Sequence, residues 1–209
     1  MRNDIRSLSS VASMEHGIIA AVGSGKQGKS CSLHSLISLC FPNRTVAMLD
    51  DLEYPISVFP RNYVKCQSIA DVPVGAVVVI EDVNRIFHSR GSGNSATLQR
   101  WLGVISHKSN VVCFTSQSLA STDLEFFRSQ DSVVMNKYMH EEDLRFERPE
   151  FRQDQMSANE YINEASVLYP DTDRRAWCFF GRWNELVPVP KADWWTEKHS
   201  FILRDVPIC

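Results

Sequence analysis

Residues 23–30 read GSGKQGKS and match the phosphate-binding pattern G-x-x-x-x-G-K-[ST] at every fixed position. The glycines allow the backbone to curl, so that successive N–H groups face one hollow in which a polyphosphate can sit. Lys29 supplies a positive charge for the β- and γ-phosphates, and the Ser30 hydroxyl is a ligand for Mg²⁺. The pattern therefore predicts a nucleoside-triphosphate site. The residues expected to contact the nucleotide are Gly23, Ser24, Gly25, Lys26, Gln27, Gly28, Lys29, Ser30 and Cys31.

The sequence on either side of this loop is that of a strand and a helix. Residues 16–22 form a short apolar run, and a helix is expected to begin at about Gly28, with its positive dipole end under the phosphates. Apolar side chains then recur at helical spacing until Pro42, which should end the helix. These side chains are Leu33, Leu36, Ile37 and Cys40. Strand, loop and helix in this order make a chance Gly/Ser turn the weaker alternative.

Composition limits the class of protein. The chain has 209 residues, of which 44% are hydrophobic and 22% charged, as in an ordinary globular α/β domain. The net charge of −3 excludes a generally basic surface, so contact with nucleic acid would need a local patch or several subunits. Six cysteines without a C-x-x-C pair indicate reduced thiols in an intracellular protein. No apolar run approaches the roughly 18 residues of a membrane span, and we expect no signal peptide.

A second informative stretch, residues 75–82, ends in two carboxylates. Four β-branched residues, VVVI, predict a central parallel strand covered on both faces, and Glu81 and Asp82 follow it. This is the form of a Walker B motif about 50 residues after the phosphate loop, in which the first acid holds Mg²⁺ and the second polarises the attacking water. The usual order is Asp then Glu. The reversed order leaves open which of the two acids is the base.

A third strand is expected over residues 109–118, and its end is polar. In ATPases with an extra strand between the two Walker motifs, a side chain at this end senses the γ-phosphate. Gln117 is our first candidate, because an amide can donate to the phosphate and accept from the attacking water, and Thr115 is the second. Between these strands, residues 84–95 combine a Gly/Ser-rich tip with three basic side chains that could grip DNA phosphates, or could simply be a charged surface loop. These are Arg85, His88 and Arg90.

The remaining segments complete an α/β pattern. Strands are expected within residues 44–49, 63–66 and 132–135, a hairpin over 176–190, and a helix over 157–169 with Ser157 and Glu160 as a capping box. Residues 1–15 are a lead-in segment, 16–139 the ATPase core, and 140–209 a helical segment and hairpin of one domain. Aromatic residues of the hairpin could stack on bases, but covering the sheet edge is the favoured interpretation. The acids at 50, 51 and 53 could contact Mg²⁺-bound water or a neighbouring subunit, or form a solvated turn.

Taken together, VVVIED at 77–82 and SHKSNVVCFTSQSLASTDLEFFRSQDSVVMN at 106–136 resemble the FtsK–HerA superfamily of P-loop ATPases. Within it, the chain is similar to the genome-packaging ATPases of membrane-containing double-stranded DNA viruses and to Zot-like phage assembly proteins. Residues 15–140 carry the resemblance. Gln117 and Arg128 match the family pattern, whereas Ser106 stands where Arg commonly precedes His107, and the Walker B acids are reversed.

The resemblance implies an ASCE/RecA-like P-loop fold: a mainly parallel central sheet flanked by helices, here with a C-terminal β-hairpin. It also implies a pentameric or hexameric ring that uses ATP and Mg²⁺ to move double-stranded DNA at a viral capsid vertex or portal, in the host cytoplasm or the virion. One subunit would then offer a trans cation to its neighbour's γ-phosphate. Arg128 is the first candidate, ahead of Arg100 and Lys108, with a surface ion pair as the alternative role.

Two other functions stay open. A small-molecule kinase shares the phosphate loop and the length, but it normally needs an Arg-rich lid, and a strand ending in paired acids fits hydrolysis better. A Zot-like assembly ATPase would power phage extrusion, but such proteins commonly carry a membrane span.

Overall fold

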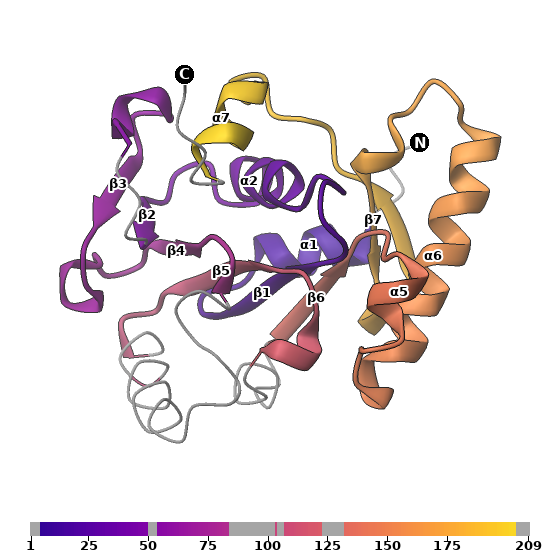
Figure 1. Cartoon of the computed structure of the whole chain (residues 1–209). Helices are drawn as coiled ribbons and strands as arrows, with labels where there is room; N and C mark the ends of the chain where they lie inside the picture. The colour runs from indigo at the N-terminus through magenta and orange to yellow at the C-terminus, as the bar shows by residue number, and fades with distance from the viewer. Residues whose placement is uncertain (1–4, 50–53, 84–102, 104–106, 123–131, 204–209) are drawn as a thin grey trace.

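The computed structural model describes residues 5–49, 54–83, 103, 107–122 and 132–203. Its centre is an eight-stranded sheet in the order β3-β2-β4-β5-β1-β6-β7-β8 (Figure 1). The strands are β1 (Gly17–Val22), β2 (Val46–Leu49), β3 (Tyr63–Cys66), β4 (Val77–Ile80), β5 (Val111–Ser116), β6 (Ser132–Asn136), β7 (Trp177–Phe180) and β8 (Glu185–Pro188). The six strands β1 to β6 pair in parallel, and β7 is antiparallel to both β6 and β8.

The parallel register brings the ends of three strands to one edge of the sheet. Val22 of β1 lies opposite Ser116 of β5 and Asn136 of β6, and Ile80 of β4 pairs with Phe114 of β5. Parallel strands present their functional loops at their carboxyl ends. The loop at residues 23–30, the acids Glu81 and Asp82 and the polar end of β5 therefore share this edge. Strand β5 lies between β1 and β4, which confirms the extra strand expected between the two Walker motifs.

Both faces of the sheet are covered by packed side chains. Along β1, Ile19 and Ala21 face one core, and Ile18, Ala20 and Val22 face the other. The first core contains side chains of α1 (Arg6–Ala12) and α2 (Lys29–Cys40). The second core includes Leu119 and Met139, with side chains of α5 (Glu141–Leu144) and α6 (Pro149–Leu168) packed against it. Burial on both faces explains why the strands read as unbroken apolar runs.

The lead-in segment contributes a helix to the core. Helix α1 buries Val11 completely and packs against α2. Figure 1 shows α2 and α7 (Glu197–Ile202) on the same side of the sheet, and α6 running beside β7. Short 3₁₀ turns, Ile56–Val58 and Ile69–Asp71, interrupt the irregular stretch between β2 and β4. Among the described residues, no helix is long and apolar enough to cross a membrane.

The helix expected over 157–169 begins eight residues earlier than predicted. Arg148 is the N-cap of α6 and Pro149 occupies its first turn, where a proline costs no helical hydrogen bond. Ser157 and Glu160 lie inside the helix, so the expected capping box was wrong. The residues before Ser157 are mostly good helix formers without an apolar stripe, so periodicity did not reveal them. Instead, Ala158, Ile162 and Ala165 pack on Trp177 and Phe179 of β7.

The predicted hairpin extends the sheet at the β6 edge. Its two strands, β7 and β8, pair in the antiparallel manner, and the turn contains Asn184 in a left-handed conformation. Several expectations lie outside the described residues: the acids at 50, 51 and 53, the basic residues Arg85, His88 and Arg90, and the trans-cation candidates Arg100 and Arg128.

Substitutions in α6 should lower the free energy of unfolding at buried positions and leave it nearly unchanged at exposed ones. Ile162→Ala should lower the free energy of unfolding by about 2–4 kcal/mol, because its side chain is 1% exposed against β7. Val167→Ala on the same helix should change that free energy by less than about 0.5 kcal/mol, since Val167 is 80% exposed. Urea denaturation followed by circular dichroism measures both, and equal effects would contradict this packing.

Candidate functional site

At two of the three loop glycines, the backbone conformation and the neighbouring protein atoms disfavour any side chain. Gly23 has φ +152°, and a Cβ there would lie 2.8 Å from the Lys137 Cβ and 2.9 Å from the Tyr138 carbonyl oxygen. Gly28 is the N-cap of α2 with φ +75°, and a Cβ there would come within 3.2 Å of Arg175. Around Gly25 a Cβ would meet nothing within 4 Å. Gly25 instead lines the cavity in front of the loop, where a ligand would approach the backbone.

The loop is held from behind by the segment that follows β6. The backbone N–H of Ser24 donates to the Tyr138 carbonyl at 3.1 Å, and its hydroxyl donates to the Asp143 carboxylate. The same hydroxyl accepts from the backbone N–H of His140 at 2.7 Å. Ser24 is therefore buried and faces the protein. Its backbone N–H is engaged as well, and Ser24 is not among the residues that line the cavity in front of the loop.

Lys29 lies across the loop. Its Nζ donates to the carbonyl oxygens of Gly23, at 2.8 Å, and Ser24, at 2.9 Å. These bonds place the ammonium inside the curl of the loop, in the cavity that the loop lines. The pattern predicts that this ammonium binds phosphate oxygens.

The Glu81 carboxylate is the centre of the site. Its Oε2 accepts hydrogen bonds from Ser30 Oγ and Thr115 Oγ1, each at 2.8 Å. Its Oε1 lies 3.1 Å from Nε2 of His34 on α2. Three donors from the loop helix and from β5 thus converge on one acid at the end of β4. The carboxylate is 6% exposed, which makes these bonds necessary for burying a charge.

The pKa of Glu81 is lowered from its ordinary value. Burial would raise it, but the hydrogen bonds from His34, Ser30 and Thr115 favour the ionised form and outweigh burial. Glu81 is therefore a carboxylate at neutral pH. A carboxylate with a lowered pKa and both oxygens already accepting hydrogen bonds is a weak base.

Asp82 has a different environment from Glu81. It adopts a left-handed conformation with φ +52°, and its backbone N–H donates to Thr115 Oγ1 at 2.8 Å. It is only partly buried and lines a cavity of about 740 Å³. Gln117, which is exposed at the end of β5, lines the same cavity. The other lining residues are Gly25, Lys26, Gly28, Lys29, Ser30, Cys31, Glu81, Thr115, Ser116, Ser200 and Leu203.

The residues around this cavity fit Mg²⁺. The ion prefers oxygen ligands and usually takes only one or two protein carboxylates, with water and substrate phosphates completing an octahedron. Ser30 Oγ and Glu81 Oε2 supply such oxygens within 2.8 Å of each other, near Lys29. Within the described ranges, no group of three or more His, Cys, Asp or Glu side chains could form an all-protein metal cage. A substrate-assisted Mg²⁺ site is the type that these residues suit.

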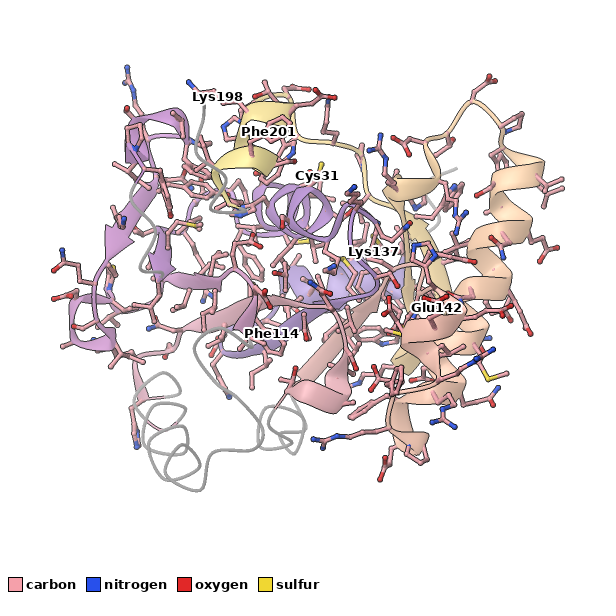
Figure 2. The ribbon with its side chains drawn as sticks, viewed as in Figure 1. Cys31, Phe114, Lys137, Glu142, Lys198 and Phe201 are labelled. Carbon is pink, nitrogen blue, oxygen red and sulfur yellow. The ribbon has the colours of Figure 1, made fainter. Side chains whose placement is uncertain are left out.

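The sequence did not reveal several residues of the site. His34 lies among the apolar residues of α2. A polar residue within such an apolar stripe was the one sequence signal that could have marked it as part of the site. Lys137 is 1% exposed, and its Nζ donates to Ser32 Oγ at 2.9 Å and to the carbonyls of Arg175, at 2.6 Å, and Trp177, at 2.8 Å. Figure 2 shows it in the interior, and its bond to Ser32 places it near the start of α2. These bonds join α2 to the C-terminal hairpin, which no local pattern indicates.

Thr115, the second candidate for the γ-phosphate sensor, and Lys108, a candidate for the trans cation, both make hydrogen bonds within the protein. Thr115 holds Glu81 and the Asp82 backbone, so Gln117 is left as the side chain at the open end of β5. The Lys108 Nζ donates to the Val72 carbonyl at 2.7 Å, near the start of β5 and thus at the opposite edge of the sheet from the phosphate loop.

Comparisons with known proteins show what the fold is. No family model and no curated protein sequence matches the chain. Among solved structures, the genome packaging NTPase B204 from Sulfolobus turreted icosahedral virus 2, in complex with AMP, is similar with a TM-score of 0.51 and 14% identity, over 85% of this chain and 98% of that one. B204, the DNA-packaging ATPase from Sulfolobus turreted icosahedral virus, gives 0.50 and 13%, over 84% and 98%. The chain has the fold of a P-loop NTPase.

This similarity confirms the sequence-based resemblance at the level of fold. The N-terminal domain of zonular occludens toxin from Neisseria meningitidis is also similar, with a TM-score of 0.41 and 16% identity over 57% of this chain and 76% of that one. The predicted mainly parallel sheet, flanking helices and C-terminal hairpin are confirmed as well. The residue roles stay predictions.

A constrained and an unconstrained glycine of the loop should respond differently to a methyl group. Gly23→Ala should lower the free energy of unfolding by about 1–3 kcal/mol, because its Cβ would collide with Lys137 in a conformation that L residues rarely adopt. Gly25→Ala should stay within about 0.5 kcal/mol of the parent chain, since its Cβ meets nothing. Thermal unfolding without nucleotide compares the two, and a stable Gly23→Ala protein would contradict this loop geometry.

Proposed function

We propose that the chain is an ATP-hydrolysing motor that moves double-stranded DNA into a preformed viral capsid, acting as a ring of identical subunits. The observation that carries the proposal is the buried Glu81 carboxylate, bound by Ser30 of the phosphate loop and Thr115 of β5, beside the cavity that Lys29 enters. Similarity of fold to packaging NTPases supports the choice of this motor among the P-loop proteins.

The two Walker B acids receive distinct roles in this proposal. Glu81 holds Mg²⁺ together with Ser30, because it is ionised, buried and already oriented by three donors. Asp82 polarises the attacking water, because it lies at the partly exposed wall of the cavity. Bound Mg²⁺ would neutralise charge on the phosphate oxygens. Lys29 binds the β- and γ-phosphates, and Gln117 orients the water against the γ-phosphate.

A second cavity supports the proposal that a complete nucleotide binds, rather than a phosphate group alone. Its volume is about 410 Å³, and it shares Lys26, Gly28, Cys31 and Ser200 with the phosphate cavity. Figure 2 labels Cys31 on α2, on the same side of the sheet as α7. The indole of Trp195 and the polar side chains of Thr196 and Lys191 also line it. We place the ribose and base there, since this cavity continues from the start of α2, where the loop ends.

The DNA-binding and trans-acting residues complete the proposal. Arg85, His88 and Arg90 would contact DNA phosphates without reading bases, and Arg128 would reach the γ-phosphate of the neighbouring subunit. A net charge of −3 requires such a local patch, because the chain as a whole repels DNA. The motor would act in the host cytoplasm or virion, at the capsid vertex or portal. A Zot-like assembly ATPase is the alternative with the same site.

The coupling to DNA can be measured directly. Steady-state ATP hydrolysis should rise when long double-stranded DNA is added, and should increase more than linearly with protein concentration, because the trans cation exists only in the assembled ring. The assay compares DNA of equal mass in long and short fragments over a range of protein concentrations. Turnover that ignores DNA but starts with a small phosphate acceptor would identify a kinase and refute the motor.

The residue roles can be tested in the same assay. Lys29→Ala should reduce turnover about 100-fold or more while the thermal unfolding curve stays unchanged. Asp82→Asn should keep Mg²⁺-dependent nucleotide binding but lose turnover by about 100-fold, as removal of a general base does. Glu81→Gln should instead weaken Mg²⁺-dependent binding. If Glu81→Gln binds nucleotide tightly without turnover, the roles of the two acids are reversed.

A further inference from the structure

His34 lies behind the metal-holding side of the site rather than in the cavity. It sits on α2 one turn after Ser30 and is completely buried. Its ring lies between Tyr63, the first residue of β3, and Glu81, which follows the last residue of β4. It does not line the nucleotide cavity, so it would touch neither the substrate nor the reacting atoms.

Both ring nitrogens of His34 have partners. Nε2 lies 3.1 Å from Glu81 Oε1, and an ionised carboxylate can only accept, so this nitrogen carries a hydrogen. Nδ1 lies 3.0 Å from the Tyr63 hydroxyl oxygen. Burial raises the pKa of Tyr63 above its ordinary value, with Cys113 and Glu81 adding to the effect, so the phenol keeps its proton. Tyr63, His34 and Glu81 thus form a chain of polar contacts that runs from β3, the outermost strand of the sheet, to the site.

Aromatic packing fixes the orientation of the imidazole. The ring centroid lies 5.1 Å from that of Trp195, with an interplanar angle of 30°, and 5.9 Å from that of Phe59. Trp194 meets the ring edge-on at 6.0 Å. A ring enclosed in this way cannot turn without displacing its neighbours. The direction of the Nε2–H bond toward Glu81 is therefore set by the packing of the C-terminal segment on α2.

We propose that His34 is a positioning residue for the acid that holds Mg²⁺. By donating to Oε1, it fixes the rotation of the Glu81 carboxylate so that Oε2 is directed toward Ser30, where the second protein oxygen lies. Hydrogen-bond partners behind a metal ligand orient it in this way and tune its affinity. The inference rests on the proposed function, because it assigns a role within that Mg²⁺ site.

Replacing His34 by glutamine or by asparagine tests whether the residue orients Glu81 or only fills space in the core. Glutamine can place its side-chain N–H near the position of Nε2, whereas the shorter asparagine reaches only the position of Nδ1. His34→Gln therefore keeps a donor for Glu81, and His34→Asn keeps only the contact with Tyr63. Both bury one amide in place of the ring, so any general loss of packing affects both variants.

The readout is nucleotide affinity with and without Mg²⁺. It is measured by titrating a fluorescent ATP analogue into the full chain, in buffer that contains either EDTA or excess Mg²⁺. His34→Asn should raise the Mg²⁺ concentration for half-maximal binding about 10-fold or more, the usual effect of losing a partner behind a ligand. Its affinity in EDTA should match the parent chain, and His34→Gln should keep the parent Mg²⁺ requirement. The same shift should appear in the Mg²⁺ dependence of hydrolysis.

The outcomes distinguish this inference from the proposed function. Equal Mg²⁺ requirements for His34→Asn and the parent chain, or equal losses in both amide variants, would overturn the role of His34 alone. A parent chain that shows no Mg²⁺-dependent binding or hydrolysis would overturn the proposed function itself. If His34→Asn does not bind nucleotide in EDTA, Tyr63→Phe becomes the test variant. A severalfold higher Mg²⁺ requirement in Tyr63→Phe supports the positioning role, and an unchanged one overturns it.

Discussion

The buried Glu81 carboxylate is the interaction on which the arrangement of the site depends. A charge removed from water is stable only when hydrogen bonds replace its hydration. Here the donors are Ser30 and His34 from α2 and Thr115 from β5, while the acid itself ends β4. These contacts require β4, β5 and the loop after β1 to end at the same edge, as the parallel strand order provides. Burying one acid therefore links the loop helix to two strands.

A second buried charge joins the phosphate loop to the C-terminal part of the chain. Within the described part of the chain, the hydrogen bonds of the Lys137 ammonium go to neutral groups. Its ammonium is satisfied by the Ser32 hydroxyl and by the carbonyls of Arg175 and Trp177. Nearby, the backbone of Gly28 approaches Arg175 so closely that a Cβ would be strained. The hairpin thus extends the sheet and also encloses the start of α2, next to the cavity where we place the base.

The different surroundings of the two acids address a question that the sequence left open. The order Glu then Asp reverses the usual Walker B order, and residue identity alone does not decide which acid is the base. Burial distinguishes them: Glu81 is buried, with both oxygens engaged and a lowered pKa, whereas Asp82 is partly buried in a left-handed turn at the cavity wall. The roles that we propose for the two acids follow this difference in burial, because hydrogen bonding to the charged form of Glu81 reduces its basicity.

By itself, the sequence determined the phosphate loop, the strands around it, helix α2 with its apolar stripe and the C-terminal hairpin. It could do so because each depends on contacts within a few residues or on a strict periodicity. Helix α6 began earlier than its apolar pattern indicated, because its first turns depend on a proline and on helix propensity. The partners of Glu81, the role of His34 and the contacts of Lys137 were decided only by the tertiary structure. Those contacts join residues 34 to 105 positions apart, and chain folding, not local pattern, determines which buried polar groups meet.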